Sequence, residues 1–251
     1  MHEHELWVTA LMNRYVAAPA EALLRLGVAL GLPGLHPGDG HPWTNYVAME
    51  ILLVLILMAA FALLRMQLSV DRPRTFQLVF ESVYNFLAEQ ARDIIGHGSE
   101  RFLAFFCTLF IFILSANLLG VNPSFESPTM YYYVPAGLAL CSFVYYNSQG
   151  VRAQGPIGYL KHFAGPMWWL AWFMFPLEII SHCIRPVSLT IRLFANMYAG
   201  EQVTVGFIGV GPYIVPVLLM GLHVFVSFLQ AFIFTMLSIA YVGGAVAHEE
   251  H

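Results

Sequence analysis

Apolar residues recur in long runs along most of this chain, separated by short polar segments. The runs at 46–64, 102–120 and 131–147 are each long enough to cross a bilayer, because about 20 helical residues span its hydrocarbon core. Two further apolar arms, 167–205 and 214–247, are longer still. The pattern predicts an all-α integral membrane protein with about five membrane helices.

Other stretches are amphipathic. Residues 5–31 and 76–95 place charged side chains among apolar ones at helical spacing, which is typical of helices that lie on a membrane surface. Residues 32–43 are rich in Pro and Gly, and we expect a loop there. The sequence therefore predicts an N-terminal amphipathic, extracytoplasmic segment, residues 1–45, and a membrane domain, residues 46–251.

The two C-terminal arms are too long to stand upright in a membrane. At about 1.5 Å per residue they would measure about 58 Å and about 50 Å, whereas the hydrocarbon core is about 30 Å thick. A Gly- and Pro-containing break at 209–212 separates them, and Pro176 and Pro186 offer bend points in the first arm. We expect a hairpin of two strongly tilted helices over about 167–247.

Composition supports this fold class and excludes several functions. Only 10% of the residues are charged and 59% are hydrophobic, whereas a soluble domain carries about 25% charged residues. The basic residues are scattered and the net charge is −4, so nucleic acid is not an expected partner. The chain has no Gly-rich phosphate loop and no Cys pattern for a metal, so we expect no cofactor and no metal.

The basic residues also orient the chain. Residues 121–130 contain no Lys or Arg, whereas the segments 65–75, 76–95 and 148–166 hold six. The positive-inside rule then places the N-terminus outside, and the basic linkers and the C-terminus in the cytoplasm. The N-terminus resembles neither a secretory signal nor a transit peptide, which favours a bacterial plasma (inner) membrane. The six basic residues of these segments are Arg65, Arg72, Arg74, Arg92, Arg152 and Lys161.

Charged and polar residues in the first arm fall on one helical face. Their intervals are 3, 4, 3, 4 and 4 residues, which align them along a helix. A charge at the centre of a membrane helix costs at least about 2.5 kcal/mol, so such an alignment indicates function. The set consists of Glu178, Ser181, Arg185, Ser188, Arg192 and Asn196.

A second polar row follows in the last arm. Two helices joined by a short turn can press such faces together or turn both toward a partner. Glu201 lies on the face opposite Arg192 and flanks the same turn as His223, so the acid and the imidazole could titrate together near one membrane surface. This second row consists of His223, Ser227, Gln230 and Tyr241.

Structural roles compete with functional ones for several of these residues. Arg185 could simply reach the inner surface, and Glu178 could be its ion-pair partner. His223 alone would more often be a hydrogen-bonded core residue. Arg192 is harder to explain structurally, because it lies 14 residues after Glu178 in an apolar arm, from which a side chain reaches the surface with difficulty.

Several segments resemble the subunit a family of F-type ATP synthases. The resemblance covers about residues 45–251 and is strongest in the two C-terminal motifs, which are followed by a terminal HEEH. The segments are RPVSLTIRLFANMYAGE (185–201), LQAFIFTMLSIAYV (229–242), NLLGVNP (117–123) and GHGSERF (96–102).

The resemblance implies a stator subunit that couples proton translocation to rotary ATP synthesis without being a catalyst itself. Its long helices would curl around a ring of c subunits, with Arg192 facing the ring. The implied partners are that ring, the b subunits of the peripheral stalk and the lipid bilayer. On this basis the inlet half-channel holds Asn196, Glu201, His223 and Gln230, and the outlet side holds Glu178 with Ser181 and Arg185; we place Ser188 in the same path.

One segment departs from the family pattern. The family often carries an acid and an amide after Pro-Thr, whereas this chain reads PTMYYYVP (128–135), with Tyr131 and Tyr133 at those places. Either the inlet uses other groups, or the nearby Glu126 substitutes.

Two other classes of function compete with this interpretation. A stand-alone secondary transporter would use Arg192 to bind an anionic substrate. A membrane enzyme could hold a metal at HEEH (248–251), but this motif lacks the HExxH spacing, and we expect a solvated tail there.

Overall fold

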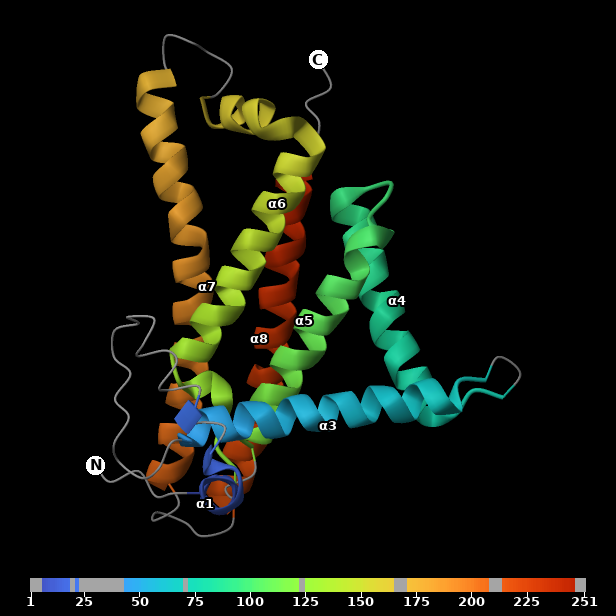
Figure 1. Ribbon diagram of the computed structural model, residues 1–251, viewed down its shortest axis with the longest axis vertical. Helices are drawn as coiled ribbons and strands as arrows, with labels where there is room; N and C mark the ends of the chain where they lie inside the picture. Colours follow the sequence, from blue (N-terminus) through green and yellow to red (C-terminus); the bar gives the residue numbers. More distant parts are fainter. Residues whose placement is uncertain are drawn as a thin grey trace.

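The computed structural model describes residues 6–18, 21–22, 43–69, 72–121, 125–164, 171–207 and 214–246 (Figure 1). These residues form helices without a strand, so the predicted all-α fold is confirmed. The elements are α1 (Trp7–Tyr15), α3 (Asn45–Gln67), α4 (Thr75–Ile95), α5 (Glu100–Leu119), the 3₁₀ turn η1 (Pro128–Met130), α6 (Tyr133–Ala164), α7 (Ala171–Phe207) and α8 (Ile214–Val246).

Three of these helices are long and apolar enough to cross a membrane: α3, α5 and the Val217–Val246 part of α8. They coincide with three of the predicted membrane segments. The other two segments, in α6 and α7, are also helical. That α6 and α7 cross the membrane stays a prediction.

The two C-terminal arms form the predicted hairpin partners. α7 has 37 residues and α8 has 33, and they run in opposite directions along the long axis of the molecule (Figure 1). α7 passes Pro176 and Pro186 as one continuous helix.

α3 runs across the long axis of the molecule in the same view (Figure 1). A membrane that α3 crosses upright would therefore hold α7 and α8 nearer to its plane, as their lengths also require.

α5, α6, α7 and α8 pack together around buried side chains, and α4 covers α5 and α8. The largest buried groups include Phe106, Phe110, Leu193 and Phe234, each at most 2% exposed. Since lipid is as apolar as these side chains, close packing rather than exclusion from water holds such helices together. This packing fixes which faces of α7 and α8 meet.

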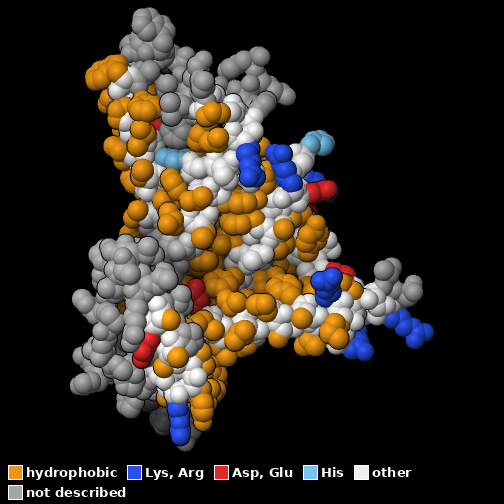
Figure 2. Space-filling view, in the orientation of Figure 1, with side chains coloured by type: hydrophobic (Ala, Val, Ile, Leu, Met, Phe, Trp, Pro, Cys, Tyr) orange, Lys and Arg blue, Asp and Glu red, His pale blue; other side chains and the backbone are white. Residues whose placement is uncertain are grey.

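The outer faces of α3 and α7 are apolar and exposed. Figure 2 shows hydrophobic side chains spread over both helices, with charged groups confined to a few places. Leu55 on α3 and Ile184 on α7 are each more than half exposed. Such surfaces suit lipid or an apolar partner rather than water.

One predicted boundary is wrong. Residues 148–166 were expected to be a linker, but 148–154 extend the first helical part of α6, and a second helical part follows Gly155 and ends at Ala164. The helix bends at Gly155, whose φ of 74° is left-handed, and Pro156 follows it directly. A Gly-Pro pair permits a kink without ending helical structure on either side, so the polar composition of this segment did not indicate a loop.

The other expected segments are a surface helix, a loop, a break between the two long arms and a C-terminal tail. The predicted surface helix is α4, which buries Leu87 and Ala91 on one face; its position on a membrane surface stays a prediction. Most of the expected loop 32–43, the break at 209–212 and the HEEH tail lie outside the described residues.

Candidate functional site at the α7–α8 interface

The aligned polar residues of the first arm lie on α7 and are called the α7 stripe; those of the last arm lie on α8 and are called the α8 row. The two sets meet at two points. Near the middle of the interface, Asn196 Nδ2 donates a hydrogen bond to Gln230 Oε1 at 2.8 Å. Nearer the start of α7, the Arg185 guanidinium lies 5.0 Å from the centre of the Tyr241 ring, a distance at which a cation is attracted to the ring face. Of the two expected arrangements, the structure shows the polar faces in contact at these points.

The α8 row is buried without being fully hydrogen-bonded. His223, Ser227 and Gln230 are 6%, 0% and 2% exposed. His223 Nε2, Ser227 Oγ and Gln230 Nε2 are all buried atoms that lack a hydrogen-bond partner among the described residues. Buried polar groups are nearly always satisfied by protein or ordered water. Aligned along one helix face, these three atoms form a row of buried polar groups that lack a protein partner among the described residues.

His223 packs against α7 at the residue before Glu201. A Cβ atom at Gly200 would lie 3.4 Å from both Cε1 and Nδ1 of His223, so the imidazole ring lies directly over Gly200. Glu201 Oε2 is buried without a partner in the described part of the chain. His223 Nε2 likewise has no hydrogen-bond partner among the described residues, unlike an ordinary hydrogen-bonded core histidine. That the acid and the imidazole titrate together stays a prediction.

The segment that departs from the family pattern packs against α7 through the η1 turn. Tyr131 Oη donates a hydrogen bond to Glu126 Oε2 at 2.9 Å. The helix that η1 contacts is the one that carries Glu201. Tyr133 instead stacks on Tyr46, with ring centres 5.7 Å apart. Of the two alternatives, this placement favours Glu126 as the substituting acid.

Asn117 joins this site although the sequence did not single it out. Its Nδ2 donates to the Ser227 carbonyl at 3.4 Å, and its Oδ1 accepts from Thr129 Oγ1 at 2.6 Å. Thr129 Oγ1 also lies 2.7 Å from Ser127 Oγ. The signal in the sequence was an Asn within the apolar segment that forms α5, because a membrane helix carries a polar side chain only where it has partners. In the structure Asn117 is fully buried. The η1 turn is thereby tied to the α8 row.

Arg192 is placed differently from its neighbours in the α7 stripe. Its side chain is exposed, and no residue in the described part of the chain accepts a hydrogen bond from it or forms an ion pair with it. Asn196 follows one helical turn later. Arg192 is thus a charge at the surface of α7, one turn from the Asn196–Gln230 contact.

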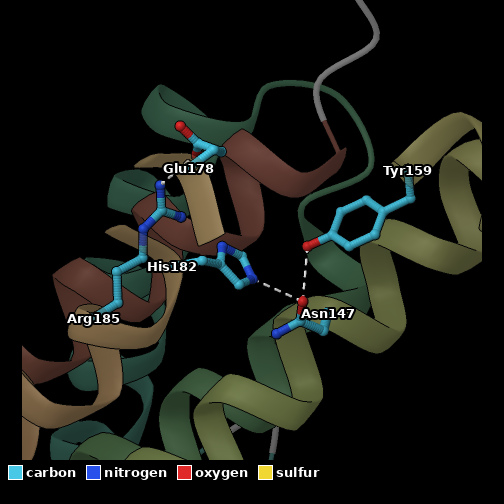
Figure 3. Close-up of polar contacts among 5 residues, drawn as sticks. All are labelled: Asn147, Tyr159, Glu178, His182 and Arg185. Carbon is cyan, nitrogen blue, oxygen red and sulfur yellow. Dashed lines mark hydrogen bonds and ion pairs between the residues drawn. The ribbon is translucent and has the colours of Figure 1, made fainter. Parts of the chain in front are cut away.

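The beginning of the α7 stripe forms a second polar group (Figure 3). An Arg185 nitrogen lies 3.8 Å from Glu178 Oε1, so the predicted ion pair is confirmed. Both side chains are about one third exposed, which limits the stability the pair contributes to at most about 1 kcal/mol. Ser188 donates to the Arg185 carbonyl at 2.9 Å, and Ser181 is exposed.

His182 belongs to this second group, and helical spacing did not predict it. Its Nε2 lies 2.8 Å from Asn147 Oδ1, and the same oxygen accepts a hydrogen bond from Tyr159 Oη at 2.9 Å. Figure 3 shows His182 between the Glu178–Arg185 pair and these two α6 residues. His182 lies next to Ser181 and so falls off the stripe. Its proximity to Glu178, one turn earlier, was the only signal in the sequence.

The arrangement can carry protons but shows no metal centre. Within the residues that the structure covers, no three His, Cys, Asp or Glu side chains could hold a metal ion together. The chain instead presents two polar groups, one near Glu201 and one near Glu178. Arg192 lies between them along α7.

Comparison with known proteins gives consistent matches over this region. The family model described as the ATP synthase A chain matches residues 47–243, which include both polar groups. A protein named ATP synthase subunit a from Solibacter usitatus (strain Ellin6076) is 55% identical over 239 residues, covering 95% of this chain and 100% of the relative. Relatives of the same name come from Koribacter versatilis (strain Ellin345), 46% identical over 98% of both chains, and Sulfurimonas denitrificans (strain ATCC 33889 / DSM 1251), 40% identical over 78% of this chain and 90% of the relative.

Proposed function

The chain belongs to the ATP synthase A chain family, and we propose that it forms both proton half-channels of a rotary ATP synthase. It is a membrane-embedded component of a multi-subunit complex. Protons cross the membrane along α7 and α8 and drive a rotating ring of c subunits, which couples their passage to ATP synthesis. Family membership gives no support to the alternative of a stand-alone transporter.

The observation that carries this proposal is the row of buried, unpartnered polar atoms on α8. His223, Ser227 and Gln230 follow one another along a single face. The row begins beside Glu201 and reaches Asn196, one turn from the exposed Arg192. A proton moving between water molecules in this row would arrive at the surface of α7 where a rotor carboxylate passes.

Arg192 supplies a fixed positive charge at that surface. A guanidinium does not deprotonate in a protein. It attracts an ionised rotor carboxylate and favours loss of that carboxylate's proton. The same charge prevents protons from passing straight from the inlet to the outlet. Each proton that crosses a potential of 100 mV contributes about 2.3 kcal/mol.

The surface around Arg192 suits a ring of apolar helices. An exposed apolar row lies beside the α7 stripe, at intervals of 4, 3 and 4 residues. Membrane helices associate through close packing of such side chains. The row consists of Ile180, Ile184, Val187 and Ile191.

The second polar group forms the outlet. Glu178, paired with Arg185, accepts protons released by the rotor and passes them inward, with Ser181 and Ser188 along the same face. Basic residues place this end of α6 and α7 at the cytoplasmic side of a bacterial inner membrane. The N-terminus then lies outside and the C-terminus inside. The b subunits of the peripheral stalk hold the chain against rotation, and catalysis takes place on other subunits.

Glu201→Gln tests the inlet. We expect ATP-driven proton uptake into vesicles to fall several-fold without being abolished, because water and His223 still connect the path. Glu89→Gln, on the exposed face of α4, is the matched control and should pump normally. Unchanged pumping in Glu201→Gln, with a normally assembled complex, would exclude Glu201 from the path.

Glu126→Gln tests the substituted acid. We expect slower proton uptake, because a carboxylate proposed to take part in the inlet is lost. Tyr131→Phe removes the hydrogen bond to Glu126 but keeps the carboxylate, and should have the smaller effect. A larger loss in Tyr131→Phe than in Glu126→Gln would assign the role to the tyrosine instead.

A further inference from the structure

We propose that His182 is a proton-transfer residue of the outlet, held for this purpose by Asn147 of α6. The inference rests on the proposed function and deepens it. Its basis is the geometry of one polar cluster between α6 and α7, which consists of Asn147, Tyr159, Glu178, His182 and Arg185 (Figure 3).

Asn147 fixes the protonation pattern of the imidazole. Its Nδ2 donates to the Phe143 carbonyl at 2.7 Å, which orients the amide so that Oδ1 faces the cluster. Oδ1 is an acceptor only, so the His182 nitrogen 2.8 Å away, Nε2, must carry a hydrogen. Neutral His182 therefore has its basic nitrogen at Nδ1. The imidazole is held as a base in one tautomer.

The described neighbours of His182 include one ion pair and three tyrosines. On α7, Glu178 and Arg185, one turn to either side of His182, pair with each other. α6 contributes Tyr146, whose ring lies 5.1 Å from the imidazole, and Tyr159. α8 contributes Tyr241, against Tyr146 and Arg185. Among these described groups, an imidazole is the side chain whose ordinary pKa lies closest to neutral pH.

A purely structural histidine would not need this setting. His182 is 8% exposed and lies one turn after Glu178, the residue proposed to receive protons from the rotor. In the transfer step, Nδ1 takes one proton from the Glu178 side, and the imidazolium then releases one proton toward the cytoplasm. Nε2 keeps its hydrogen on Asn147 throughout, and no electron changes place. Imidazole is suited to this step because it titrates near neutral pH.

His182→Gln is the decisive variant, because its amide NH₂ can still donate to Asn147 while it can no longer titrate. ATP-driven proton uptake is measured in inside-out vesicles carrying the whole complex, at outer pH values from about 5.5 to about 9. The outer medium then feeds the outlet. We expect the wild-type rate to change with a midpoint in the neutral range. The variant should lose this midpoint and be at least about tenfold slower at neutral pH.

Matched variants separate the possible outcomes. Ser148→Ala, next to Asn147, removes a hydroxyl that bonds only to its own helix, and should keep the wild-type rate and profile. Arg192→Ala in the same vesicles tests the proposed function itself. If Arg192→Ala stops pumping while His182→Gln keeps the wild-type rate and pH profile, only the role of His182 is overturned.

A second variant covers a failure of His182→Gln to assemble. Asn147→Asp places a carboxylate on the imidazole, which stabilises the imidazolium. We expect the midpoint of the pH profile to move upward by about one unit. An unmoved midpoint would overturn the proposal, since His182 would then not be the group that titrates.

Discussion

We expect Arg192→Ala to abolish ATP-driven proton uptake into vesicles while the complex still assembles. Arg192 is exposed and forms no hydrogen bond or ion pair within the described residues. Exposed substitutions of this kind change stability by about 0.5 kcal/mol or less. Loss of pumping would therefore reflect the missing charge, not a missing contact. Without this charge, ionised rotor carboxylates lose their attraction to α7.

Two matched variants sharpen this experiment. Arg92→Ala removes an exposed arginine of α4, whose 3.7 Å ion pair with Glu100 lies outside the hairpin, and should leave pumping intact. Arg192→Lys keeps a charge that can be lost on desolvation, so we expect slower pumping that falls further as pH rises. Full pumping in Arg192→Ala would mean that the α7 stripe is structural.

The fold could be predicted for segments whose own length and composition are enough to make them helical. The two arms were expected at 167–205 and 214–247, and the helices are Ala171–Phe207 and Ile214–Val246. Length and apolar composition suffice there, because a helix satisfies its own backbone in lipid. The α6 boundary could not be predicted in this way. The Gly155–Pro156 pair does end the first helical part of α6, but a second helical part follows it directly, where the polar composition predicted a linker.

The candidate site shows the same division. The α7 stripe could be read from spacing, because all its members share one face. His182, Asn147 and Asn117 could not, because each gains its role from a contact with another helix. The Glu178–Arg185 pair was foreseen because a pair on one helix needs no tertiary information. The contact between Asn196 and Gln230 required knowledge of which faces meet.

We expect the second large effect on proton conduction at one of two buried serines of α8, with the other serine as its control. Ser227 and Ser238 are both 0% exposed. Ser238 Oγ lies 2.8 Å from Ser142 Oγ and donates to the Phe234 carbonyl at 3.0 Å. Ser227 Oγ has no partner among the described residues. The first hydroxyl therefore holds helices together, whereas the second is available to water.

Ser227→Val should nearly stop proton conduction, because two methyl groups replace the hydroxyl and break the row of water between His223 and Gln230. Any loss of thermal stability should come from packing the larger side chain, since Ser227 Oγ has no hydrogen-bond partner among the described residues. Ser238→Ala should lower stability by about 1 kcal/mol through the lost helix–helix bond while conduction persists. Passive conduction of the membrane sector and the thermal midpoint of the complex measure the two effects. Equal conduction losses in both variants would mean that the α8 row is ordinary core and that protons take another path.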